Sequence, residues 1–230
     1  MVFDRDRLEQ ELSTLPLEHA IAFAASCCQR LLPNYDAFAT IEHQGSPYLL
    51  RQALDEVWQY LKGAPFPESH IRELMEAIVV APPDMDANHP SLFAPLAHNA
   101  AVAIHYALNC CLTKEQKWAA YSAAEAVDCV MNYLAGVNTV YFPQTEIHGP
   151  HLSNEKIFTY ESLLDHWIKE EAPLMVVELE QQQWDLKRLR DHEILSSAFL
   201  DEIRLSSSAT GIQPFPRGLA VGPNQELVNG

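Results

Sequence analysis

The feature that most constrains this chain is a long run without charge. Residues 87–112 contain no Asp, Glu, Lys or Arg. A helix that spans a membrane needs about 20 consecutive apolar residues. This run is interrupted by polar residues and prolines, so we predict no membrane span and a buried core helix over residues 93–111. The interrupting residues are Asn88, His89, Pro90, Pro95, His98, Asn99, His105 and Asn109.

Apolar residues recur with helical spacing through most of the remaining sequence. A stripe over residues 50–61 follows Ser46 and Pro47, which suit a helix start, and precedes Gly63, which suits a helix stop. Comparable patterns predict helices over residues 4–14, 17–32, 68–79 and 113–135. Pro33 is expected to end the second of these helices. A charged amphipathic region over residues 153–205 is expected to break or kink near Pro173.

These patterns predict an all-α fold, a single-domain bundle of about seven or eight helices. We expect a helical domain over residues 1–212 and a loosely ordered C-terminal tail over residues 213–230. Residues 137–152 form the least helical stretch of the domain. We interpret them as an inserted surface loop, with a small hairpin as the alternative.

The composition limits the kinds of partner. The formal net charge is −16, from 31 acidic and 15 basic residues. Such a surface repels phosphates, so we expect no nucleic-acid partner and no binding to an anionic membrane surface. A basic protein partner, a homodimer or plain solubility all agree with the charge.

The cysteines indicate a reducing compartment. The chain has five, two adjacent pairs and Cys129, in apolar helical runs without a CxxC motif. They lack the pattern of a disulfide framework. Residues 1–10 are charged and show no apolar signal region. We therefore expect a cytoplasmic location.

Two segments carry a family resemblance. The first is Arg-Leu-Leu-Pro-Asn-Tyr at residues 30–35, with Phe38 and the run Leu-Arg-Gln-Ala-Leu-Asp-Glu-Val-Trp at residues 50–58. The second is Asp-His-Glu at residues 191–193, Asp201 and Ser-Ala-Thr-Gly-Ile at residues 208–212. Together they resemble the YjaG-like family of bacterial proteins, a domain of unknown function, over about residues 17–212.

That resemblance implies a compact helical, cytoplasmic bacterial protein. It implies no reaction and supplies no catalytic residues. In the family's C-terminal motif Ala209 replaces an asparagine, so any role of that amide is in doubt in this chain.

Arg30, Tyr35 and Arg51 are candidates for an anion or peptide pocket. The structural alternative is a helix corner. Pro33 ends the helix, Arg30 bonds the open carbonyls, and Tyr35 packs its ring with its hydroxyl at the rim. This corner is the favoured interpretation of the residues.

His98, His105 and Asn109 share one face of the predicted core helix and are further candidates for a ligand pocket. A separation of seven residues is too long for two ligands of one metal, for which a spacing of three or four is typical. His148 and His151 have a suitable spacing but lie in a Gly/Pro loop without a supporting carboxylate or thiolate framework. We therefore predict no metal site and treat these two histidines only as weak candidates.

The sequence contains no GxSxG, P-loop or GxGxxG motif, and we expect no cofactor. The favoured function is a non-enzymatic protein that acts through protein–protein interaction or homo-oligomerisation. The alternative is a bundle that binds a small molecule or metal, including an enzyme of unknown reaction, with His98, His105 and Asn109 facing Tyr35 or Arg51. A third hypothesis makes residues 137–152 a recognition element.

Overall fold

A computed structural model of the chain describes residues 2–81, 93–141 and 173–210. The described residues form eight helices and no strand, which confirms the predicted all-α class and helix number. Within these ranges no helix combines the length and apolarity that crossing a bilayer requires. The helices are α1 (Arg5–Ser13), α2 (Leu17–Glu42), α3 (Pro47–Leu61), α4 (Glu68–Val80), α5 (Phe93–Thr113), α6 (Lys117–Tyr141), α8 (Pro173–Arg190) and α9 (Ser197–Ala209).

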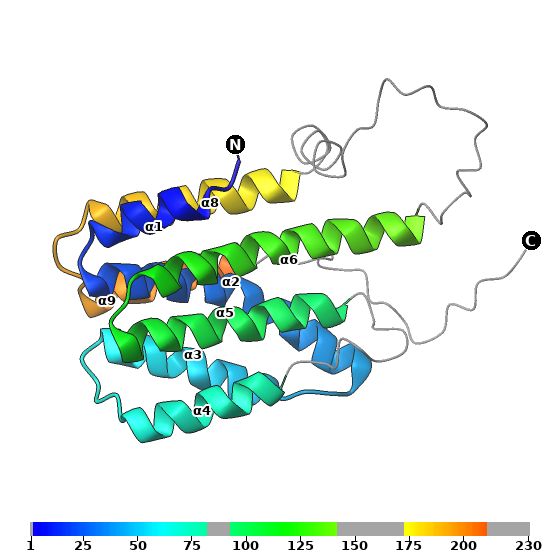
Figure 1. Cartoon of the computed structure of the whole chain (residues 1–230), viewed down its shortest axis with the longest axis horizontal. Helices are drawn as coiled ribbons and strands as arrows, with labels where there is room; N and C mark the ends of the chain where they lie inside the picture. The colour runs from blue at the N-terminus through cyan, green and yellow to red at the C-terminus, as the bar shows by residue number, and fades with distance from the viewer. Residues whose placement is uncertain (1, 82–92, 142–172, 211–230) are drawn as a thin grey trace, which may run out of the picture.

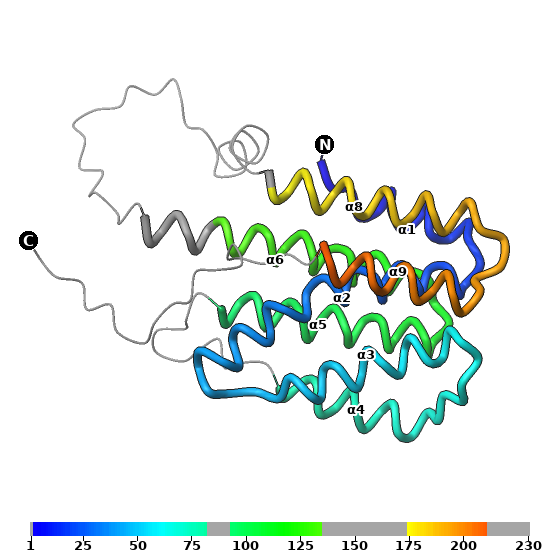
Figure 2. The backbone as a smooth tube through the Cα atoms, turned by 180° about the vertical axis from the view of Figure 1, so that it is seen from behind, coloured from blue at the N-terminus to red at the C-terminus, as the bar shows by residue number. Residues whose placement is uncertain are grey.

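Most helices lie side by side along the long axis of the molecule (Figure 1). Helix α2 is central and packs against α3, α5, α6, α8 and α9. Helices α1 and α8 form one edge of the bundle and α4 forms the opposite edge, in the front and back views alike (Figure 2). The uncharged run supplies α5, which is largely buried as predicted and packs against α2 and α6.

The prediction that Pro33 ends a helix is wrong. Helix α2 continues through Pro33 to Glu42. Proline removes one helical hydrogen bond, but it does so here inside a helix whose residues 19–32 are all buried. Burial of apolar side chains on both sides of Pro33, Leu32 and Phe38 among them, outweighs that loss.

The turn after α2 is built around Tyr35. Its hydroxyl donates a hydrogen bond to the Ala81 carbonyl oxygen (2.8 Å) and accepts one from the Ser46 N–H (3.1 Å). Gly45, with φ of +81°, brings the backbone so close that a Cβ there would lie 2.6 Å from the Tyr35 hydroxyl oxygen. The tyrosine therefore ties the end of α2 to the start of α3 and the end of α4.

Three predicted boundaries need correction. Thr113 does not cap the helix that follows it. It ends α5, and its hydroxyl donates to the Asn109 carbonyl oxygen. Residues 137–141 continue α6 through Gly136, so this part of the loop expected over 137–152 is helical. Residues 142–152, Ser153 and the expected tail over 213–230 lie outside the described residues.

Pro173 begins α8, and a separate helix, α9, follows from Ser197, where the Ser196 hydroxyl caps the Phe199 N–H at 3.2 Å. Proline suits the first turn of a helix because its missing N–H has no intrahelical partner there. The residues before Pro173 lie outside the described part of the chain, so the break expected near Pro173 stays a prediction.

The glycine turns give a test of the Tyr35 corner. Gly45→Ala introduces both backbone strain and a clash, whereas Gly63→Ala, at φ of +88° with open space around it, introduces strain alone. We expect Gly63→Ala to lower the free energy of unfolding by about 1–2 kcal/mol and Gly45→Ala to lower it by more. A Tyr35→Phe background lacks the clashing oxygen but keeps ring carbons 3.1 and 3.3 Å from the added Cβ, so the cost of Gly45→Ala should fall towards that of Gly63→Ala. Urea unfolding measures all three, and an unchanged cost in that background would refute the close contact.

Candidate functional site

The most unusual group in the core is the guanidinium of Arg30 on α2, which is 0% exposed. Its Nε and Nη2 donate to the two carboxylate oxygens of Glu178 at 2.9 and 2.8 Å. Its Nη1 donates to Asp185 Oδ2 at 2.6 Å. Both acidic residues lie on α8 and are also buried, so one cation joins two carboxylates away from water.

Further polar side chains complete this buried ion cluster. Gln182 Nε2 donates to Glu178 Oε1 (2.9 Å) and to the Ala123 carbonyl oxygen of α6 (3.1 Å). Ser26 Oγ and Gln181 Nε2 donate to the two oxygens of Asp185, at 3.1 and 2.9 Å. The extra donors stabilise the carboxylates, because one positive charge in the cluster does not neutralise two negative charges. The network links α2, α6 and α8.

The neighbouring cysteines are structural rather than reactive. Burial raises the pKa of the Cys27 thiol to about 12, although Arg30, whose Nη2 lies 3.4 Å from its sulfur, acts in the opposite direction. Burial also raises the pKa of Cys28 and Cys129. A nucleophilic cysteine needs a thiolate at neutral pH, and these thiols stay protonated. All five cysteines are buried and free, as expected of small hydrophobic residues in a core.

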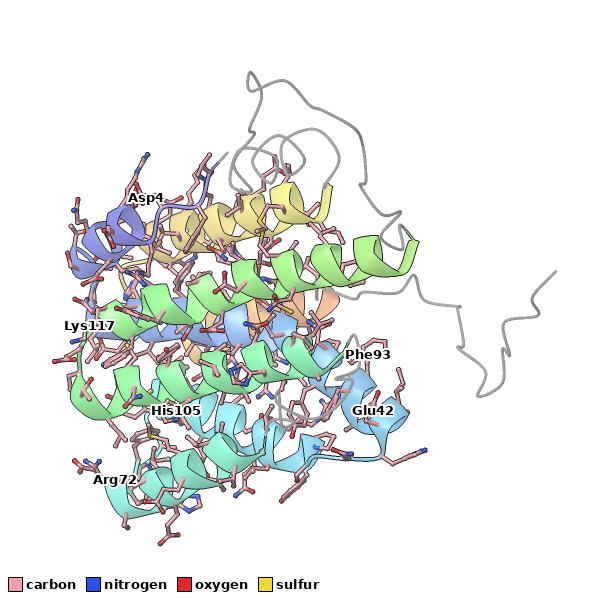
Figure 3. The ribbon with its side chains drawn as sticks, turned by 45° about the vertical axis from the view of Figure 1, so that its right-hand side comes forward. Asp4, Glu42, Arg72, Phe93, His105 and Lys117 are labelled. Atoms are coloured by element: carbon pink, nitrogen blue, oxygen red, sulfur yellow. The ribbon has the colours of Figure 1, made fainter. Side chains whose placement is uncertain are left out.

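A groove of about 260 Å³ lies between α1 and α8 on the surface side of this cluster. Gln182 lines the groove and also bonds Glu178, so the groove and the buried network share this residue. Asp4, at one end of α1, is labelled in Figure 3 and lies beside α8. The other groove residues are Val2, Phe3, Arg7, Leu8 and Glu11 around α1, and Leu179, Gln183 and Leu186 on α8.

The structure separates the first three predicted pocket residues. The guanidinium of Arg30 is bonded within the ion cluster. Tyr35 holds the corner described above, and burial raises its hydroxyl pKa. Arg51 is half-exposed and pairs with Asp36. Their role as an anion or peptide pocket has no support in these contacts.

The helix face with His98, His105 and Asn109 is half-buried. His105 faces α4 (Figure 3) and bonds the backbone of Met75, while its Nδ1 is buried without a hydrogen-bond partner. The fully engaged polar residue of α5 is instead Asn99, which donates to Glu125 Oε2 (2.8 Å) and accepts from Asn132 (2.9 Å) on α6. Among the described residues, no hydrogen bond or ion pair joins this face to Tyr35 or Arg51. Their convergence stays a prediction.

His148 and His151 lie outside the described residues. Within residues 2–81, 93–141 and 173–210, no group of three His, Cys, Asp or Glu side chains is arranged to hold a metal ion.

Sequence reasoning missed Glu178, Gln182 and Asp185. A signal was present, because the three recur at a spacing of four and three residues in phase with the buried Leu189. Polar residues at core positions of a helix indicate a buried partner of opposite charge. Because a helix end was expected at Pro33, Arg30 was assigned to the open last turn of that helix. A buried acidic partner for Arg30 was therefore not predicted.

Comparison with known proteins gives a family and a fold. A family model described as "Protein of unknown function (DUF416)" matches residues 7–213, a range that includes most of α1, which lay outside the resemblance seen in the sequence. A DUF416 family protein from Shewanella baltica, solved by crystallography at 1.91 Å resolution, is similar with a TM-score of 0.70 and 23% identity, over 90% of this chain and 95% of that chain. At this identity the likeness supports the fold alone. No curated protein matches the chain.

The ion cluster can be tested by removing its cation. Arg30→Met leaves two buried carboxylates without a counter-charge, so we expect the free energy of unfolding to fall by about 3–5 kcal/mol. Adding Glu178→Gln and Asp185→Asn removes the unpaired charges and should recover part of that loss. Arg51→Met, at the exposed pair with Asp36, is the matched control and should cost at most about 1 kcal/mol. Chemical denaturation measures the series, and equal costs for the two arginines would contradict a dry ion cluster.

His105 gives a pH-dependent prediction. Burial lowers its folded-state pKa below the ordinary value of 6.5, against the effect of its bond to Met75. The unfolded chain therefore binds more protons between these two pKa values, and stability falls as the pH drops through about 6.5. We expect His105→Gln to flatten this part of the curve of unfolding free energy against pH. If the two curves of unfolding free energy run parallel below pH 7, His105 does not contribute to the pH dependence of stability.

Proposed function

We propose that this chain, which belongs to the DUF416 family of proteins of unknown function, is a binding protein for a segment of a basic protein partner. The proposal rests on the groove between α1 and α8. From the sequence we also propose that the chain is a YjaG-like bacterial protein and that it acts in the cytoplasm through protein–protein interaction.

The size of the groove favours a peptide side chain over a whole small molecule. Pockets that enclose small ligands have volumes of about 300–1,000 Å³, and this groove has about 260 Å³. It can take one or two bulky side chains from an extended or helical segment. The apolar walls, Phe3 and Leu8 on one side and Leu179 and Leu186 on the other, suit an apolar anchor residue.

The charge around the groove defines the flanks of that segment. The groove lining holds two carboxylates, Asp4 and Glu11, and one guanidinium, Arg7. Glu11 already pairs with Arg7 at 3.1 Å and with Arg190 at 3.6 Å, which leaves Asp4 as the lining carboxylate without an ion pair among the described residues. The whole chain carries a net charge of −16. Lysine or arginine residues on either side of the apolar anchor would gain from this potential, mainly through faster association.

The proposal is tested with two labelled peptides of identical length that share a central Leu-Phe anchor, one flanked by lysines and one by glutamates. Fluorescence anisotropy should show binding of the lysine peptide and none of the glutamate peptide, because only the first matches the acidic rim.

Gln183 offers a matched pair of protein variants, because it is exposed and lines the groove. Gln183→Trp fills the groove and should weaken binding of the lysine peptide by about tenfold or more, equal to about 1.4 kcal/mol. Gln183→Ala leaves the groove open and should bind like wild type. Equal binding by both variants would place the site elsewhere, and no binding of either peptide would refute the proposed partner chemistry.

A further inference from the structure

The outward face of α8 carries apolar side chains in a strongly acidic protein. Val177 and Trp184 are each 53% exposed, and Val176 is exposed as well. Val177 and Trp184 are seven residues apart, which places them on the same side of the helix. This outer face is turned away from the core-facing Glu178, Gln182 and Asp185. It is also distinct from the groove side, which holds Leu179 and Leu186.

The unpaired charges on this outer face are balanced, because Arg188, four residues after Trp184, is already paired with Glu202 of α9 at 2.6 Å. Glu180 precedes Trp184 by four residues and Lys187 follows it by three, so both lie beside the indole. Neither forms an ion pair within the described part of the chain. Helix α8 carries three basic residues in its last turn, Lys187, Arg188 and Arg190, although the chain as a whole has a large acidic excess.

This arrangement is self-complementary. When a helix packs antiparallel against its own copy with the two-fold axis near Trp184, a residue four positions before the axis meets a residue about three positions after it. Glu180 of each copy then faces Lys187 of the other, and the two indoles pack at the centre. An axis near Glu180, which would bring Val177 against Trp184, places the two Glu180 carboxylates together and is disfavoured by repulsion.

We propose that the outer face of α8 is a homodimer interface, in which Trp184 packs across a two-fold axis between reciprocal Glu180–Lys187 ion pairs. A second copy of the chain fits better than a basic partner, because the face offers one carboxylate and one ammonium rather than an acidic patch. It is also a place where two copies of net charge −16 can approach without like charges opposing each other. The proposal does not depend on peptide binding in the groove.

Sedimentation equilibrium of the full chain, over a concentration series and without peptide, tests the interface. Wild-type protein should approach a mass of twice 25.9 kDa. Trp184→Gln should remain at the mass of a monomer. Val80→Gln is the matched control, because Val80 is an exposed apolar residue of α4, 81% exposed and on the edge of the bundle opposite α8, and it should dimerise like wild type.

The charge pair gives the sharper test. Glu180→Lys and Lys187→Glu should each weaken dimerisation by about tenfold, and the double variant, which exchanges the two charges, should restore it. All of these substitutions replace exposed side chains, and circular dichroism confirms that each variant is folded. A wild-type chain that stays monomeric, or a charge-exchanged variant no better than the single variants, overturns the proposed interface.

Discussion

The structure depends on one buried interaction, the contact of Arg30 with Glu178 and Asp185. Three ionised groups away from water are costly unless every one is paired, and here the guanidinium bonds both carboxylates while Gln181, Gln182 and Ser26 supply the remaining donors. Because apolar packing alone tolerates small shifts and such a network does not, the cluster fixes how α8 lies on α2. Both surfaces to which we assign binding, the groove with α1 and the outer face, are presented by α8.

The fold class and most helices were predictable from local pattern. The Ser46-Pro47 start of α3, the end of α3 before Gly63 and the uncharged α5 follow from rules that act within a few residues. Pro33 shows where such rules fail. A proline usually ends a helix, but α2 is surrounded by five other helices, and their packing outweighs the loss of one backbone bond. The residues near Pro33 in the sequence do not indicate which helices pack around α2.

The candidate site was less predictable for the same reason. Arg30 was selected as a pocket residue or as a donor to open helix carbonyls, but its partners lie 148 and 155 positions away along the chain. The groove joins α1 to α8, which are also distant in sequence and meet only in the folded bundle. Spacing on one helix, the basis for grouping His98 and His105, identifies a shared face but not what lies opposite. For His105 that is the Met75 backbone of α4.

Amide hydrogen exchange would show whether the Arg30 cluster orients α8. In wild-type protein the amides of α8 should be protected to a degree similar to those of α2. In the Arg30→Met variant, protection should fall most in α8 and in the part of α2 around residue 30, and less in α3 and α4, which do not pack closely against α8. Unchanged protection of α8, or an equal loss in all helices, would contradict the account.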